Sequence, residues 1–66
     1  MTNPLNNGCK PNEHYNKSRA SVLLGVSRPT LDKYIKEGLI KMSLHKRLLS
    51  LTIKGTELIG FYNSRS

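Results

Sequence analysis

The stretch LLGVSRPTLDKYIKEGLIK, residues 23–41, contains two glycines, and each of them interrupts an apolar pattern. Gly25 ends a first apolar run, because glycine adopts a left-handed turn at little steric cost. Ser27 then supplies a helix cap, and Pro29 lies in the first helical turn, where the missing N–H would have no partner. Gly38 ends this second helix. The pattern therefore predicts two short helices joined by a sharp turn.

The first of these helices is predicted over residues 17–24. Asn16 is its expected cap, and the apolar residues that follow recur at helical spacing. In the second helix Leu31, Tyr34 and Ile35 share one face, which we expect to pack inward. Two such helices meet across a short glycine-containing turn in a helix-turn-helix unit.

The periodicity changes to two after Gly38, because apolar and polar residues alternate over 40–44 and again over 49–53. This alternation predicts the two strands of a hairpin, with the loop at His45–Arg47. A third helix is predicted over 55–62 from its apolar spacing. The expected fold class is therefore small α+β, with two helices, a two-stranded β-hairpin and a short C-terminal helix.

We expect one domain, which covers residues 14–62. Residues 1–13 are rich in Asn, Pro and Gly and are predicted to form a flexible arm, and residues 63–66 are predicted to be a tail. The single cysteine, Cys9, excludes an internal disulfide, and one Cys with two distant His residues is too few ligands for a structural zinc site. We therefore expect no metal and no other cofactor.

Basic residues are in large excess in this chain of 66 residues. Eleven Lys and Arg face four Asp and Glu, which gives a formal net charge of +7. Most of this charge lies between Lys17 and Lys54, within the part that is predicted to fold. Such a balance favours a polyanionic partner, first of all nucleic acid.

Catalysis and membrane insertion receive little support. The few acidic residues are scattered, and no nucleophile has a visible base partner or a phosphate-binding loop, so we expect that the protein is not an enzyme. No apolar run approaches the roughly 20 residues that span a bilayer, and the start of the chain lacks a signal-peptide pattern. We therefore expect a soluble, cytoplasmic protein with no membrane partner.

In a helix-turn-helix unit the start of the second helix enters the major groove of double-stranded DNA. The residues that would reach the DNA from there are Ser27, Arg28, Thr30 and Lys33. Arg28 is the first choice, because a guanidinium binds guanine or a phosphate through two parallel hydrogen bonds. Thr30 suits a capping arrangement as well as it suits a DNA contact.

Weaker contacts with the DNA backbone are expected at other basic or exposed positions. Lys17, Ser18 and Arg19 begin the first helix, where side chains and free N–H groups can bind phosphate. A capped helix end in solvent explains these residues almost as well. Lys36 lies further along the second helix, where simple solvation is the stronger interpretation.

The run NKSRASVLLGVSRPTLDKYIKEGLIK, residues 16–41, resembles the MerR-like and excisionase-like winged helix-turn-helix DNA-binding domains. The resemblance continues to IKGTELIGFY, residues 53–62, which is similar to the last helix of that family. It implies that the hairpin is a wing and that Lys46 and Arg47 at its tip reach the adjacent minor groove or backbone of the DNA. The family's usual glycine is missing from this tip. The alternative interpretation is that the two cations make no DNA contact and keep the exposed sheet edge from pairing with another chain.

MerR regulators continue into a dimerisation helix and an effector domain, which these 66 residues do not include. The chain is therefore most similar to an excisionase, or recombination directionality factor, of a phage or integrative element. This resemblance implies a nucleoid-associated bacterial or phage protein that binds repeated sites, bends DNA and assists a tyrosine integrase in excision. It also implies a monomer in solution that associates cooperatively on DNA. Two alternatives remain: a small transcriptional repressor, and a protein adaptor for a recombinase or replication protein that makes no DNA contact.

Overall fold

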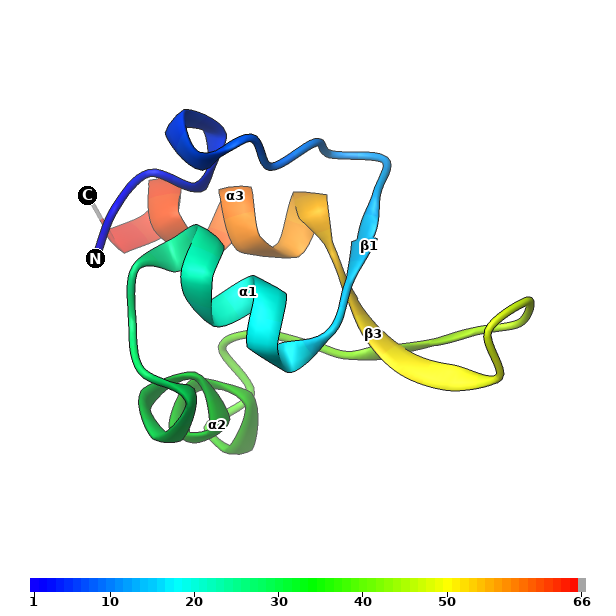
Figure 1. Ribbon diagram of the computed structural model, residues 1–66. Coiled ribbons are helices and arrows are strands. Elements are labelled where there is room, and N and C mark those ends of the chain that lie inside the picture. Colours follow the sequence, from blue (N-terminus) through cyan, green and yellow to red (C-terminus); the bar gives the residue numbers. More distant parts are fainter. Residues whose placement is uncertain (66) are drawn as a thin grey trace.

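A computed structural model describes residues 1–65 of the chain. Within these residues the protein forms a small α+β fold with three α-helices, a short 3-10 helix and a three-stranded antiparallel sheet (Figure 1). The elements in chain order are η1 (Pro4–Asn7), β1 (His14–Tyr15), α1 (Lys17–Leu24), α2 (Arg28–Lys36), β2 (Ser43–His45), β3 (Ser50–Lys54) and α3 (Gly55–Arg65).

The predicted boundaries of the first two helices are confirmed. Asn16 and Ser27 are the N-caps of α1 and α2, and each side-chain oxygen accepts a hydrogen bond from the backbone N–H three residues later. Gly25 and Gly38 follow the two helices with φ angles of 68° and 78°, in the left-handed region that favours glycine. Local cap chemistry therefore accounts for both ends of each helix.

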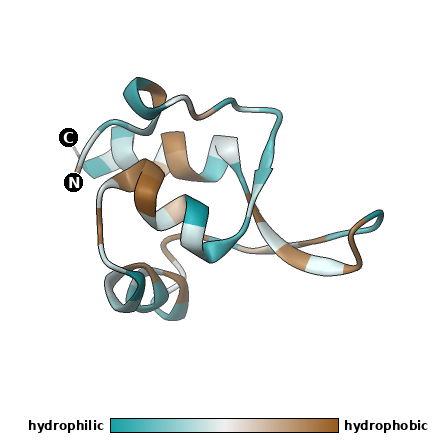
Figure 2. Ribbon diagram, viewed as in Figure 1, coloured by the Kyte–Doolittle hydropathy of each residue, from teal (hydrophilic) through white to brown (hydrophobic). Residues whose placement is uncertain are grey.

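Helix α1 lies at the centre of the molecule and contacts η1, α2, α3, β1 and β3. Figure 1 shows α3 on one side of α1 and α2 on the other. Figure 2 shows apolar positions on α1 and α3 where the two helices lie side by side. The buried apolar core consists of Cys9, Ala20, Leu23, Leu24, Leu31, Ile40, Ile53, Leu58 and Phe61.

The first thirteen residues do not form the flexible arm that we expected. The N–H of Thr2 donates to the carbonyl of Leu24 at 2.8 Å, and Nδ2 of Asn7 donates to the carbonyl of Leu23 at 2.9 Å. These carbonyls end α1 and have no partner within the helix. Cys9 is buried in the core. The polar residues of this segment indicated flexibility, but two of them cap the C-terminal end of α1.

The start of α3 lies against the same N-terminal segment. The N–H of Gly55 donates to the carbonyl of Glu13 at 2.8 Å. A Cβ atom at Gly55 would collide with the backbone carbonyl of Lys10. Glycine is therefore required here by the close approach of two backbones, although glycine has a low intrinsic helix propensity.

Helix α3 is longer than the predicted 55–62, because it continues to Arg65 and includes most of the predicted tail. The Arg65 guanidinium carbon lies 5.8 Å from the centre of the Tyr34 ring and 5.2 Å from that of Phe61. These contacts between a cation and aromatic faces stabilise the last turn. Ser66, the remaining residue of the predicted tail, lies outside the described residues.

The sheet has three strands instead of the two predicted, in the order β1-β3-β2. The additional strand β1 has only two residues, which is too short to produce a recognisable alternation. The predicted two-stranded hairpin is thus part of a three-stranded sheet. The paired residues are His14 with Lys54, Tyr15 with Ile53, Ser43 with Thr52, Leu44 with Leu51, and His45 with Ser50.

Strand β2 begins at Ser43 and not at Ile40. The N–H groups of Leu39 and Ile40 donate to the carbonyl of Tyr34, at 3.0 and 3.4 Å, and so close the end of α2. These donors are therefore not free to pair with β3. Ile40 contributes to the core instead, with an exposed fraction of 1%.

The hairpin turn also differs from the prediction. It occupies residues 46–49 and not His45–Arg47, and His45 is the last residue of β2. Leu49, which was expected to begin the second strand, lies in the turn with a φ of 52°. Because leucine seldom adopts a positive φ, the sequence contained no sign of this turn.

Candidate nucleic-acid interface

The structure brings the N-terminal ends of α1 and α2 together. Nη1 of Arg28 donates a hydrogen bond to Oγ of Ser18 at 2.9 Å, and both side chains are exposed. Nζ of Lys17 lies 3.1 Å from Oδ1 of Asp32. Two cross-helix links therefore place the predicted residues of both helices in one cluster. The positive ends of two helix dipoles lie in the same cluster, which favours an anion there.

Ser27 and Thr30 are engaged with each other at the start of α2. The Ser27 hydroxyl oxygen accepts from the Thr30 N–H at 3.3 Å, and the two hydroxyl groups are 2.8 Å apart and share a hydrogen bond. Thr30 thus takes part in the capping arrangement that was one of its two predicted roles. Because both hydroxyls are already used in the cap, they are weaker candidates for base recognition than the Arg28 guanidinium.

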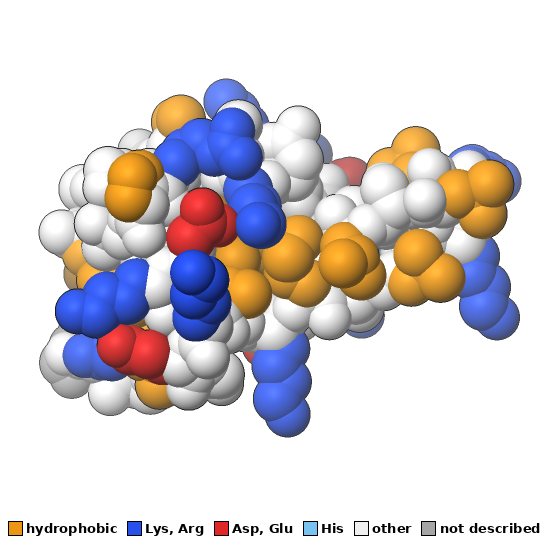
Figure 3. Space-filling model, turned by 90° about the horizontal axis from the view of Figure 1, so that it is seen from below, with side chains coloured by type: hydrophobic (Ala, Val, Ile, Leu, Met, Phe, Trp, Pro, Cys, Tyr) orange, Lys and Arg blue, Asp and Glu red, His pale blue; other side chains and the backbone are white. Residues whose placement is uncertain are grey.

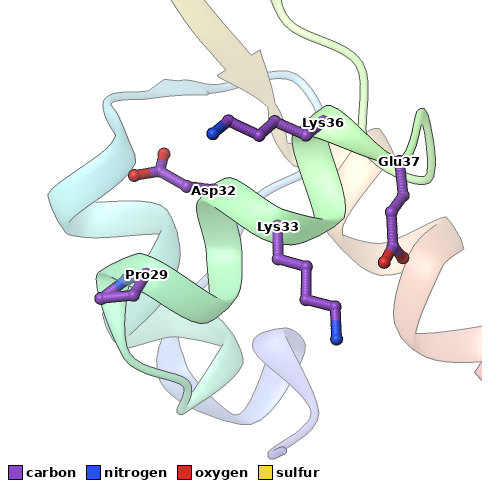
Figure 4. A pocket seen from close by; sticks show the side chains of 5 residues that line it. All are labelled: Pro29, Asp32, Lys33, Lys36 and Glu37. Carbon is purple, nitrogen blue, oxygen red and sulfur yellow. The ribbon is translucent and has the colours of Figure 1, made fainter.

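The outer face of α2 carries charges of both signs around a shallow hollow (Figure 4). Lys33 and Lys36 lie here beside Asp32 and Glu37, and Pro29 completes the lining. In Figure 4, Asp32 and Lys36 extend to one side of the helix, whereas Lys33 and Glu37 extend to another. The two carboxylates were not among the predicted contacts, although each lies four residues from one of the lysines in the sequence, at the spacing that brings side chains together on a helix. They make this face nearly neutral.

The remaining predicted cations lie on the first turn of α1 and at the hairpin turn. Arg19 is exposed on the first turn of α1, and Lys46 and Arg47 are exposed in the hairpin turn. The hairpin projects beyond the helices, in a molecule with principal extents of 32 × 23 × 18 Å (Figure 1). Figure 3 shows Lys and Arg side chains over the helical body and at the far end of the hairpin, on one face of the molecule. The predicted contacts thus form two groups.

Between these two groups of cations, Figure 3 shows a row of hydrophobic side chains along the hairpin. The exposed apolar residues of this segment are Leu44, Leu48, Leu49 and Leu51, with exposed fractions of 62, 60, 81 and 60%. Leu44, Leu49 and Leu51 were predicted as apolar strand positions and not as part of an interface. Their alternation resembles that of an ordinary half-buried strand, and only the projection of the hairpin beyond the helices exposes them.

Two histidines connect the edge strands of the sheet close to the hairpin turn. The rings of His14 and His45 are perpendicular, with their centres 4.6 Å apart. Nδ1 of His14 is 3.0 Å from Oγ1 of Thr52 on β3, and Nδ1 of His45 accepts from the N–H of Leu48 at 3.2 Å. These contacts connect β1, β2 and the hairpin turn across the sheet.

Cys9 belongs to the core and not to a reactive site. Its thiol donates to the carbonyl of Gly55 at 3.8 Å, and burial raises the pKa of the thiol above its ordinary value of 9.0. The thiolate is the reactive form, so this thiol is a poor nucleophile at neutral pH. Among residues 1–65, no three His, Cys, Asp or Glu side chains are arranged to hold a metal ion.

Comparison with models of protein families, with curated proteins and with solved structures finds no match to this chain. No helix within residues 1–65 is long and apolar enough to cross a membrane.

Proposed function

We propose that the protein binds double-stranded DNA as a winged helix-turn-helix protein. In this proposal α1 and α2 form the helix-turn-helix unit, α2 reads the major groove, and the β2–β3 hairpin is the wing. The observation that carries the proposal is the hydrogen bond from Arg28 to Ser18, which assembles the starts of α1 and α2 into one exposed basic cluster.

The distribution of charge supports two separated contacts with one duplex. Arg28 lies in the helical cluster, Arg19 lies on the first turn of α1, and the hairpin turn contains Lys46 and Arg47. Figure 3 shows Lys and Arg side chains over the helical body and at the far end of the hairpin. A duplex presents phosphates along its whole length, so a molecule with a 32 Å long axis can contact phosphates with both groups. The near neutrality of the middle of α2 assigns most of the affinity to its first turn and to the hairpin.

We further propose that this DNA binding serves excision of a mobile element, as the resemblance to excisionases suggests. The protein would bind repeated sites as a monomer that associates cooperatively, and would assist a tyrosine integrase at the nucleoid. A small transcriptional repressor would use the same DNA contacts, and an excision assay separates the two roles.

One observation favours a candidate of another class, a protein adaptor. Leu44 and Leu51 face each other across β2 and β3, and both are more than half exposed. Exposed apolar patches often mark sites of protein–protein contact. An adaptor of this kind would act without Arg28 and Lys33.

The test is a gel shift with the DNA that flanks this protein's own gene, against an unrelated duplex of the same length. Wild type is compared with the Arg28→Ala/Lys33→Ala variant and with Lys10→Ala/Lys54→Ala, which removes the same charge from outside the proposed interface. We expect discrete complexes that the first variant loses and the control retains. If all three proteins bind both DNAs equally weakly, the adaptor becomes the better proposal. Addition of the neighbouring integrase and its attachment sites then tests excision.

A further inference from the structure

Leu49 at the hairpin turn combines a strained backbone with an almost fully exposed apolar side chain. Its φ of 52° lies in the left-handed region, where a Cβ atom approaches the following carbonyl oxygen too closely. Its exposed fraction is 81%, so burial of the side chain does not compensate for this strain. Strained conformations of this kind concentrate at functional sites.

The turn that carries Leu49 is held in a defined conformation. The N–H of Leu49 donates to the carbonyl of His45 at 2.7 Å, and the N–H of Leu48 donates to Nδ1 of the same histidine at 3.2 Å. The ring of His45 in turn packs against the ring of His14 on β1, the other edge strand of the sheet. Leu48 and Leu49 are therefore displayed on an ordered support at the end of a projecting hairpin (Figure 1).

Cations lie directly beside this apolar tip. Lys46 and Arg47 precede the two leucines in the same turn and are exposed. The sequence from Lys41 to Lys54 contains no acidic residue. An apolar tip within a basic segment is complementary to a polyanion whose interior is apolar, and double-stranded DNA with its stacked bases has this chemistry.

We infer that Leu48 and Leu49 form an apolar wedge that enters the minor groove and partly unstacks one base step, while Lys46 and Arg47 bind the flanking phosphates. Architectural DNA-binding proteins use leucine and similar side chains as wedges in this way, and the duplex kinks away from the inserted side chain. The inference rests on the proposed DNA binding and adds a mechanism by which this chain would bend the duplex.

The experiment uses a duplex that contains the site found in the gel shift, with 2-aminopurine at each pyrimidine–purine step in turn and a fluorophore pair at the two ends. Unstacking raises 2-aminopurine fluorescence, and a kink raises energy transfer between the ends. Wild type is compared with Leu48→Ala, with Leu49→Gly and with Leu44→Ala. The last variant truncates an equally exposed leucine outside the turn.

We expect wild type and Leu44→Ala to raise both signals, with the fluorescence increase confined to one step. Leu48→Ala and Leu49→Gly should lose most of both signals, while affinity falls by roughly tenfold or less, because the phosphate contacts remain. Glycine adopts a positive φ without strain, so the thermal unfolding midpoint of Leu49→Gly should equal or exceed that of wild type. Loss of bending in that variant would then not reflect unfolding.

Three results would overturn the wedge, and they differ in whether the proposed DNA binding is also rejected. Tight binding by wild type without unstacking or bending rejects the wedge and leaves DNA binding intact. Equal losses in Leu44→Ala and Leu49→Gly assign the signal to the whole apolar face of the hairpin and not to a wedge at its tip, as contact between two copies on the DNA would, and sedimentation of wild type on and off DNA then examines this contact. Absence of any duplex binding by wild type rejects the proposed function together with the wedge.

Discussion

Arg28 donates a hydrogen bond from Nη1 to Oγ of Ser18 over 2.9 Å, and so connects the first turn of α2 with the first turn of α1. A guanidinium has five N–H donors, so most of the donors of Arg28 remain for a phosphate or a guanine. The hydrogen bond also restricts the rotamers of a long exposed side chain, which lowers the entropy that Arg28 would lose on binding. Ser18 thus acts as a positioning residue for Arg28.

Salt dependence separates a direct phosphate contact by Arg28 from a positioning role of Ser18. If about five phosphates are neutralised, the log–log slope of affinity against salt should be about −4 to −5, and Arg28→Ala should make it less steep by about 0.9. Ser18→Ala should lower affinity by roughly two- to tenfold and leave the slope unchanged, because it removes no charge. Fluorescence anisotropy titrations at four salt concentrations measure both quantities. Equal slopes for Arg28→Ala and wild type would exclude a phosphate contact at Arg28.

Asp32 lies on the proposed reading helix and pairs with Lys17 over 3.1 Å. Asp32→Asn should raise DNA affinity and steepen the salt slope by about 0.9, because Lys17 becomes available to a phosphate. Stability should change by less than about 1 kcal/mol, since the pair is partly exposed. Glu37→Gln is the matched control, because it removes the other carboxylate of the same face and leaves Lys17 paired. A slope that does not change in Asp32→Asn would place Lys17 outside the interface.

Gly55 and Gly60 lie in the same helix but in different surroundings. Gly55→Ala should destabilise the protein by about 1–3 kcal/mol, because the new methyl group collides with the backbone carbonyl of Lys10. Gly60→Ala meets no atom within 4 Å and should stabilise the helix by about 0.5–1 kcal/mol. Urea denaturation of both variants gives the two values. A stabilising Gly55→Ala would contradict the packing of the N-terminal segment on α3.

The amide of Asn7 tests whether the N-terminal segment caps α1. Its Nδ2 donates to the carbonyl of Leu23 and to Oγ1 of Thr2, each at 2.9 Å. Asn7→Ala should cost about 1–2 kcal/mol, because a part-buried helix carbonyl loses its partner. Asn6→Ala, at an exposed neighbouring position, should stay within about 0.5 kcal/mol of wild type. Equal stability of the two variants would show that the segment is only loosely attached.

The thiol of Cys9 makes the stability depend on alkaline pH. Burial raises its pKa in the folded state above the ordinary 9.0, so the folded chain holds this proton more tightly than the unfolded chain. The contribution to stability is therefore complete below pH 9 and is lost as the pH rises through the folded pKa. The free energy of unfolding of wild type should fall relative to Cys9→Ala above pH 9. A difference that stays constant between pH 7 and 10.5 would show that the thiol is not desolvated.

Local signals in the sequence were sufficient for the first two α-helices of the fold. Caps at Asn16 and Ser27, together with stops at Gly25 and Gly38, were assigned correctly, because each depends on the backbone chemistry of a few adjacent residues. The α+β class followed equally from the change of apolar period after Gly38. These features do not depend on which distant segment packs against them.

Distant partners decided the rest. The cap that Asn7 forms on α1, the close approach of Lys10 to Gly55 and the short strand at His14–Tyr15 each join segments far apart in the chain, so no pattern within one window reveals them. The candidate site divides in the same way. The sequence identified Arg28 as a candidate contact through its place on a helix, whereas its link to Ser18 required the packing of α1 on α2. The exposure of Leu49 likewise results from the tertiary structure, because the hairpin turn projects beyond the core and the side chain is 81% exposed there.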